Sequence, residues 1–371
     1  MLREYKSVLH IACLKGFERL TKILLDHHAS IDIQDTSRFT PLHLACFIGQ
    51  IDTALLLLKA GANTNAVDTI EQTPVFYACT GNYQNIVELL IEYKADINQI
   101  TSTGLLPLHA ACEKGNIEIV NILIKNLSNI NVKEKTVESP LHIACRQGNE
   151  RIVKLLIDHS ASVNSKTKDK MTPLHVACNN GHLNVADILY DKGYNAIVKM
   201  LLNLETDVNI SNKDGVTPLM LACKGNHINV VETLLVPKAD VMQCDNDKCS
   251  PLEYACTAGN VDIVNLLPEH GVNINLANKN GITPVHVTCR NDRAHVVNSL
   301  IEYKADINLL DILGETPFYK SRFSGNIEIV TMLINNGATI KISDTSGKFP
   351  PAIAKAKGFS SITELLEEDQ T

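Results

Sequence analysis

One heptapeptide decides the fold of this chain: Thr40-Pro41-Leu42-His43-Leu44-Ala45-Cys46. Close variants stand upstream at residues 7–13 and downstream at residues 73–79. The proline recurs at steps of 33 residues along the whole chain, apart from one step of 45 residues between Pro173 and Pro218. A fixed period of this length is typical of repeat architectures, in which each unit stacks on its neighbours.

Each unit carries the pattern of two short helices. Thr40 suits the N-cap of the first helix, and Pro41 suits its first position, where no backbone donor is lost. Apolar residues at i, i+3, i+4 and i+7 over residues 117–124 predict an amphipathic second helix. A polar, turn-like segment such as residues 95–98 then leads to the next unit as an extended hairpin loop. One such pair of helices cannot bury its apolar face alone, so the units must stack.

The unit closely resembles the ankyrin repeat. The resemblance implies an all-α solenoid of L-shaped helix–turn–helix units with β-hairpin loops on one side and a concave face of first helices and hairpins. It covers essentially the whole chain as a single array of about eleven units. Their approximate boundaries are 1–34 (N-terminal cap), 35–67, 68–100, 101–133, 134–166, 167–211 (with the insertion), 212–244, 245–277, 278–310, 311–343 and 344–371 (C-terminal cap).

The sixth unit is 12 residues longer than the others. Residues 181–204 read as two copies of a second helix, each beginning with glycine. We expect a break near Lys192-Gly193 and an added or lengthened helix on the convex side. The insertion has two possible explanations: a tolerated duplication, or a hinge or contact between the two halves.

The hairpin position that is usually glycine holds another residue in five units: Arg38, Glu71, Val137, Lys170 and Lys248. A left-handed backbone there would cost a residue with a side chain about 1–2 kcal/mol. We therefore expect these hairpins to adopt another turn or to be less ordered. The end units lack one neighbour, so we expect polar capping faces on them and a freestanding array.

Composition limits the function. The net charge of −7 argues against a nucleic-acid binder, and no apolar run approaches a membrane span or a secretory signal. Nine of the eleven cysteines share one position in the first helix, where neighbours lie about 8–10 Å apart, too far for disulfides. Buried reduced thiols indicate the cytoplasm, with the nucleus as the alternative.

No pattern indicates an enzyme, a metal site or a cofactor. The six repeat histidines fall one to a unit, and the resemblance implies hydrogen bonds from them to neighbouring hairpin backbone. Asp26-His27-His28 has no partner ligand placed by the repeat, and Cys244 and Cys249 lack the further ligands that zinc requires. Nucleotide-binding, nucleophile-elbow and zinc-protease motifs are absent from the sequence.

We therefore predict a non-enzymatic scaffold or adaptor that binds protein partners, whose identity the sequence leaves open, through the concave groove and hairpin tips, as a monomer without nucleic acid. Two apolar patches and a basic tendency between them mark candidate contacts: Leu14, Phe39, Phe47, Ile48 and Ile70; Ile312, Leu313 and Phe323; and Lys114, Arg146, Lys224 and Arg290. These apolar side chains could instead fold back into the core. A targeting module within a larger enzyme or channel, or a self-associating structural array, are the alternative functions.

Overall fold

The computed structural model describes residues 6–131, 138–180, 200, 202, 206–236, 239–321 and 326–340. These residues form helices and the turns between them, and none of them lies in a β-strand. The chain divides into two compact units, residues 1–168 (unit 1) and 169–371 (unit 2). The predicted all-α repeat fold is confirmed.

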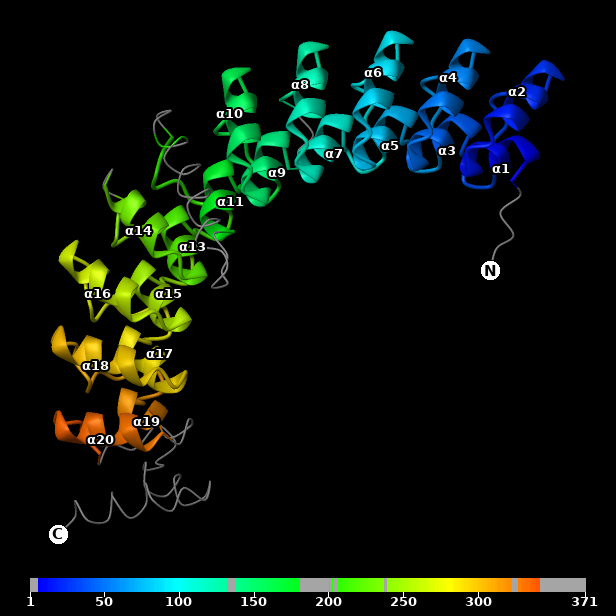
Figure 1. The fold of residues 1–371 in the computed structure, drawn as a ribbon. Helices are drawn as coiled ribbons and strands as arrows, with labels where there is room; N and C mark the ends of the chain where they lie inside the picture. Colours follow the sequence, from blue (N-terminus) through cyan, green and yellow to red (C-terminus); the bar gives the residue numbers. More distant parts are fainter. Residues whose placement is uncertain are drawn as a thin grey trace. The chain divides into compact units, whose positions relative to one another are not determined.

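Unit 1 consists of helix pairs in two layers (Figure 1). Each first helix packs against the first helix of the next repeat, and each second helix against the next second helix. The first helices are α1 (Val8–Lys15), α3 (Pro41–Ile48), α5 (Pro74–Thr80), α7 (Pro107–Lys114) and α9 (Pro140–Gln147). The second helices are α2 (Glu18–Asp26), α4 (Ile51–Lys59), α6 (Gln84–Glu92), α8 (Ile117–Lys125) and α10 (Glu150–Asp158).

Unit 2 follows the same plan. Its first helices are α11 (Pro173–Asn179), α13 (Pro218–Gly225), α15 (Pro251–Ala258), α17 (Pro284–Arg290) and α19 (Pro317–Ser321). Its second helices are α14 (Ile228–Leu235), α16 (Val261–Glu269), α18 (Ala294–Glu302) and α20 (Ile327–Asn335). The predicted break near Lys192-Gly193 lies outside the described residues.

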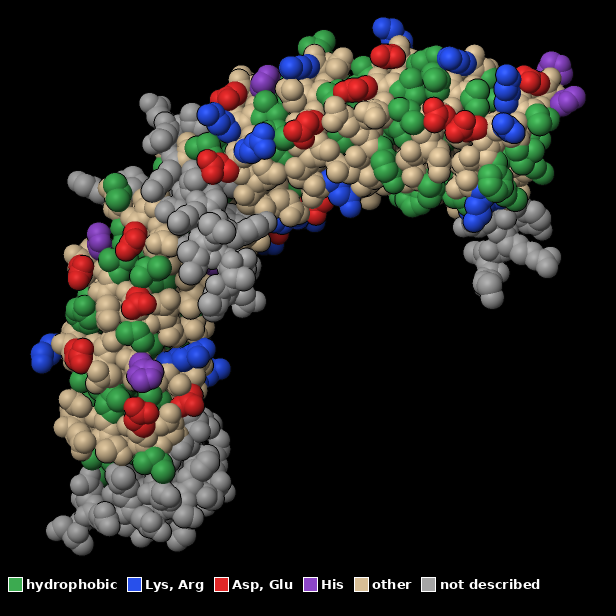
Figure 2. Space-filling view, in the orientation of Figure 1, with side chains coloured by type: hydrophobic (Ala, Val, Ile, Leu, Met, Phe, Trp, Pro, Cys, Tyr) green, Lys and Arg blue, Asp and Glu red, His purple; other side chains and the backbone are tan. Residues whose placement is uncertain are grey.

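Apolar side chains of both helix layers form the core. In α8, Ile119, Val120 and Leu123 are fully buried, as the predicted amphipathic pattern requires. The nine repeat cysteines are buried free thiols: Cys13, Cys46, Cys79, Cys112, Cys145, Cys178, Cys223, Cys256 and Cys289. The visible face of unit 1 in Figure 2 mixes basic and acidic side chains over the second helices.

The repeat histidine joins neighbouring repeats. The backbone N–H of Thr40 donates to His43 Nδ1 at 3.1 Å, so Nε2 of the neutral ring carries the hydrogen. That nitrogen lies 3.2 Å from the backbone oxygen of Gln72 in the next hairpin. The predicted structural role is confirmed in four repeats, through the pairs His10–Phe39, His43–Gln72, His175–Val216 and His286–Glu315.

The hairpins keep one turn even without glycine. Asp68 Oδ1 accepts the backbone N–H groups of Ile70 and Gln72, both at 2.9 Å. The Thr69 N–H donates to Ser37 O of the preceding hairpin at 3.1 Å. Because these hydrogen bonds fix the turn, Glu71 adopts the left-handed backbone conformation, with a φ of 62°. The expectation of another turn is therefore wrong at four positions, where φ is positive: Arg38, Glu71, Lys170 and Lys248. Val137 lies outside the described residues.

Candidate protein-binding surface

The first helices and hairpins of unit 1 form a surface that we call its inner face. Phe47 at the end of α3 is 50% exposed and meets the Tyr77 ring edge-on, at 5.7 Å between centroids. Phe39, from the hairpin before α3, lies 5.1 Å from the same ring. The predicted contacts Phe39 and Phe47 are therefore brought together around Tyr77.

Tyr77 was not among the predicted contacts, although it organises the cluster. Its hydroxyl donates to Asp68 Oδ2 at 2.6 Å, and the ring is almost fully buried. It stands at the first-helix position that holds Leu44 and Ile143 in other repeats. An aromatic residue at an otherwise aliphatic position, with aspartate nine residues before it, is the sequence signal that could have identified it.

The other members of the N-terminal patch are less closely assembled. Ile48 and Ile70 are exposed, on α3 and on the next hairpin, and Leu14 on α1 is partly buried. Phe47, Ile48 and Ile70 therefore do not fold back into the core.

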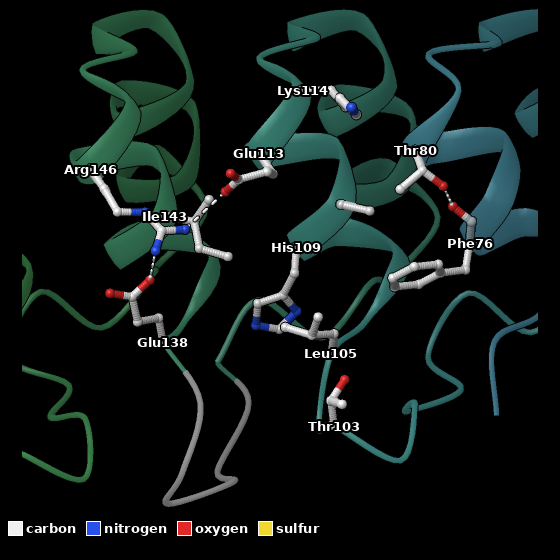
Figure 3. Close-up of a pocket in the computed structure, with 11 residues that line it drawn as sticks. Phe76, Thr80, Thr103, Leu105, His109, Glu113, Lys114, Glu138, Ile143 and Arg146 are labelled. Atoms are coloured by element: carbon white, nitrogen blue, oxygen red, sulfur yellow. Dashed lines mark hydrogen bonds and ion pairs between the residues drawn. The ribbon is translucent and has the colours of Figure 1, made fainter. Parts of the chain in front are cut away.

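A pocket of about 470 Å³ opens beside the cluster. Its apolar lining comes from Phe76, Leu105, Ala110 and Ile143, on three successive repeats (Figure 3). The remaining lining residues are polar or charged: Thr80, Thr103, His109, Glu113, Lys114, Glu138 and Arg146. The Phe76 ring lies 6.4 Å from the Tyr77 ring, so a residue that lines the pocket also contacts the aromatic cluster.

Ala110 explains why the pocket lies here. The position of Ala110 in α7 holds larger side chains in the neighbouring helices, Tyr77 in α5 and Ile143 in α9. A methyl group cannot fill the space between such neighbours, because side-chain volume sets how closely a layer packs. The sequence analysis did not identify Ala110, although its small size in this series was visible.

The charged residues at the pocket do not make it basic. Arg146 bonds to Glu113 and to Glu138, both at 2.9 Å, so the three side chains carry a net charge of −1 (Figure 3). Lys114 is exposed on α7. Lys224 and Arg290 are exposed residues of unit 2. The predicted basic groove therefore does not hold at Arg146.

His109 is a neutral, structural side chain in this pocket. Its Nδ1 accepts the Leu106 N–H at 2.9 Å, which places the hydrogen on Nε2. Burial lowers the pKa of His109 to about 4, although the Glu138 backbone lies close enough to oppose part of this effect. Within the described residues, Nε2 forms no hydrogen bond. Such a ring does not act as a general base near neutral pH.

The candidate contacts of unit 2 form a smaller apolar site. Ile312 and Leu313 are exposed at a hairpin tip, and Phe323 lies outside the described residues. Below the tip, Lys320 is buried and pairs with Asp311 at 2.6 Å and with Glu315. The lysine thereby places one positive charge beside two buried carboxylates, which offsets part of the cost of burying them.

Glu253 in α15 occupies the repeat-histidine position. Asn278 Nδ2 donates to its Oε1 at 2.7 Å, whereas Oε2 is buried without a hydrogen bond within the described part of the chain. Burial raises the pKa of this carboxyl to about 7. It also raises the pKa of the nearby Cys249 thiol to about 12, which keeps that thiol protonated and unreactive.

The described residues contain no group of three or more His, Cys, Asp or Glu side chains that could hold a metal ion. None of the described helices has the length and apolar character needed to cross a membrane.

Comparison with known proteins agrees with the repeat pattern. A family model for ankyrin repeats, in sets of three copies, matches residues 2–68, 56–136, 127–196, 190–278 and 270–344. The crystal structure of the human ASB11 ankyrin repeat domain is similar, with 28% sequence identity and a TM-score of 0.54. The match covers 63% of this chain and 99% of that one. No curated protein matches the chain.

Proposed function

The chain belongs to the ankyrin repeat family, whose members are generally protein-interaction modules, and from this we propose that it is a non-enzymatic scaffold or adaptor. Its partner-binding site is the inner face of unit 1, from the Phe47 cluster to the Ala110 pocket. The hairpin tips beside it supply further contacts. A reducing compartment, the cytoplasm or nucleus, suits its buried free thiols.

The exposed and supported ring of Phe47 is the observation that carries this proposal. Half of its side chain faces solvent, while Tyr77 supports one side of the ring and Asp68 holds the tyrosine hydroxyl. A supported aromatic side chain loses little conformational entropy on binding. Aromatic residues in this situation supply a large share of the free energy at protein interfaces.

The pocket supports the same site. It is preformed by three repeats, and its apolar lining suits one large side chain of a bound segment. The Arg146–Glu113–Glu138 cluster at its edge offers carboxylate oxygens that the arginine does not fully occupy. A partner segment would therefore place an apolar side chain in the pocket and polar backbone along the rim.

The reactive residue types also favour a non-enzymatic role. Burial raises the pKa of the Cys13 thiol to about 12 and also raises the pKa of the Cys46 and Cys79 thiols, so these thiols stay protonated at neutral pH. The repeat histidines hold hairpins, and burial lowers the pKa of His43. Neither the repeat cysteines nor the repeat histidines gather at a single site.

Affinity capture from lysate under reducing conditions tests the proposal, with wild type compared with Phe47→Glu. We expect the variant to lose a subset of partners, because a carboxylate at the cluster must be desolvated on binding. Val236→Glu is the matched control, since Val236 is an exposed apolar residue at the end of α14 in unit 2.

Each partner lost with Phe47→Glu is then purified and titrated against both variants. We expect at least a tenfold rise in Kd for Phe47→Glu and less than a twofold rise for Val236→Glu. Identical sets of partners from wild type and a folded Phe47→Glu variant would contradict the proposed site.

A further inference from the structure

The first repeat exposes apolar side chains that the other repeats bury. Ile11 in α1 is 46% exposed, whereas Leu44 and Ile143 at the same repeat position are 4% and 5% exposed. Val8 is also exposed, although this position holds a buried proline in the following repeats. The polar face expected of an N-terminal cap is therefore not what the structure shows.

The second helix of this repeat shows the same contrast. Leu20 in α2 is 37% exposed, whereas Ile86 and Ile119 at the corresponding position are 1% and 0% exposed. Ile23, one turn further along α2, is about half exposed, at a position that is partly exposed in the following repeats as well. Apolar residues of both helices thus remain uncovered at the start of the array.

The interior repeats show what normally covers these positions. The first helices α3, α5 and α7 each pack between two others, whereas α1 packs against α3 alone in its layer. The residue before each second helix also reaches back to the preceding repeat. A side chain added at Gly49 would meet the Tyr83 ring, and Asn149 Nδ2 donates to Gly115 O at 3.3 Å.

Phe17 stands at that same position, before α2, and is half exposed. We call Val8, Ile11, Phe17, Leu20 and Ile23 the N-terminal face. Five such side chains expose roughly 400 Å², a size at which apolar patches mark interaction sites. Figure 2 shows hydrophobic side chains gathered at the α1–α2 end of unit 1.

Charge indicates which partner suits this face. Unit 1 contains 17 acidic and 17 basic residues, whereas unit 2 contains 24 acidic and 17 basic residues. Two copies that meet through unit 1 therefore do not repel through net charge, as copies that meet through unit 2 would. The exposed charges of α2 are also balanced: Glu18, Arg19, Lys22 and Asp26.

We propose that the N-terminal face pairs with the same face of a second copy of this chain, in a twofold homodimer. In a twofold interface the same surface meets itself, so the five apolar side chains of one copy cover those of the other. Burial of these side chains supplies the driving force. This inference is independent of the proposed function, which uses the inner face.

Sedimentation velocity of the full chain from 1 to 200 μM, in reducing buffer, tests the dimer. We expect wild type to shift from the 40.7 kDa monomer toward twice that mass as concentration rises. Ile23→Glu should raise the dimer Kd at least tenfold, because it places a carboxylate in the apolar contact. Raising NaCl from 0.1 to 1 M should not weaken the dimer.

Two controls localise the contact. Ile312→Glu makes the same change at an exposed isoleucine of unit 2, and Phe47→Glu makes a comparable change on the inner face. Both should dimerise within twofold of wild type. If Ile23→Glu proves unfolded by circular dichroism, Val8→Lys takes its place, because Val8 is the most exposed residue of the face.

A wild-type chain that stays monomeric at every concentration would overturn the dimer. So would a dimer that Ile23→Glu and Val8→Lys leave intact, or one that Ile312→Glu weakens equally. A chain that fails to dimerise but loses partners on Phe47→Glu would refute this inference and leave the proposed function standing.

Discussion

In both α5 and α15, a tyrosine hydroxyl donates to the aspartate of its own hairpin. Tyr77 bonds to Asp68 Oδ2 at 2.6 Å in unit 1, and Tyr254 bonds to Asp245 Oδ2 at 2.8 Å in unit 2. A threonine hydroxyl near the end of each helix donates to a carbonyl four residues earlier, at 2.8 Å in α5 and 2.9 Å in α15.

The two helices differ at the repeat-histidine position, and the chemistry differs with it. Phe76 in α5 lines an open apolar pocket. Glu253 in α15 is a buried carboxyl whose pKa burial raises to about 7. The same backbone and the same tyrosine–aspartate bond thus lie beside an apolar pocket in unit 1 and beside a buried carboxyl in unit 2. Side chains that the repeat leaves free determine local function.

We expect the largest effect on stability from the hairpin aspartate, which accepts the tyrosine hydroxyl in both α5 and α15. Asp68→Ala removes the acceptor of two backbone N–H groups and of the Tyr77 hydroxyl, and Asp68 is fully buried. We expect a loss of about 3 kcal/mol in unfolding free energy in urea, because the donors are left unsatisfied. Asp245→Ala should cost about 2 kcal/mol, since Asp245 is partly exposed and water can replace it.

Tyr77→Phe serves as the control, because it removes the hydroxyl bond alone and should cost about 1 kcal/mol. Losses below 1 kcal/mol for both aspartate variants would show that the hairpins do not depend on these carboxylates.

The second prediction is a pH dependence of stability that comes from Glu253 in α15. The folded pKa of Glu253, about 7, lies above its ordinary value of 4.5, so the folded state holds the proton more tightly. The resulting stability is fully present below pH 4.5 and is lost as pH rises through about 7. Glu253→Gln should therefore match wild type near pH 4 and exceed its stability by about 2 kcal/mol at pH 8.

Thermal and urea unfolding at pH 4, 6 and 8 measure this difference. Because variant and wild type contain the same other carboxyls, the contribution of those groups to stability cancels in the difference between the two proteins. A difference that does not change between pH 4 and pH 8 would mean that Glu253 ionises at its ordinary pKa.

The third effect concerns the pocket in unit 1 that Phe76 and Ala110 line. Ala110→Leu should fill it and weaken a partner that wild type binds about tenfold, while stability changes by less than about 1 kcal/mol, because Leu44 occupies the same position in α3. Val176→Leu in α11 is the control, at the same position in unit 2. Unchanged affinity in a folded Ala110→Leu variant would show that the partner does not enter the pocket.

We expect the smallest change in stability from the hairpin residues with positive φ, and we expect it to be similar in both units. Glu71 and Lys248 have positive φ values of 62° and 61°, in the hairpins before α5 and α15. Glu71→Gly and Lys248→Gly should each raise the unfolding free energy by about 0.5–1 kcal/mol, since glycine relieves left-handed strain but costs unfolded-state entropy. Urea unfolding measures both, and a loss at either position would show that its side chain makes stabilising contacts.

Local features of the fold could be predicted because they depend on neighbouring residues in sequence. Thr40-Pro41 begins α3 as expected, and His43 bonds to the next hairpin, because a constant 33-residue spacing fixes which repeat lies beside it. The turn at Glu71 was predicted wrongly. Its conformation is held by Asp68 and by the Ser37 carbonyl of another hairpin, and residue propensity does not report such bonds.

The candidate binding surface could be predicted only in part. Phe47 was identified as an unusual residue on the inner face, but its exposure depends on where Tyr77 lies. Arg146 was taken as a free basic residue, whereas Glu113 and Glu138 neutralise it. Pairing of this kind depends on rotamers of neighbouring repeats, which the spacing of residues does not specify.

By itself, the sequence determined the period, the two helices of each unit, the burial of the cysteines and the family. These follow from local capping, helical periodicity and repeated neighbours. Only the tertiary structure decided that Ala110 leaves a pocket and that α1 and α2 keep an apolar face uncovered. Both are properties of the space between side chains, and that space depends on how neighbouring repeats pack.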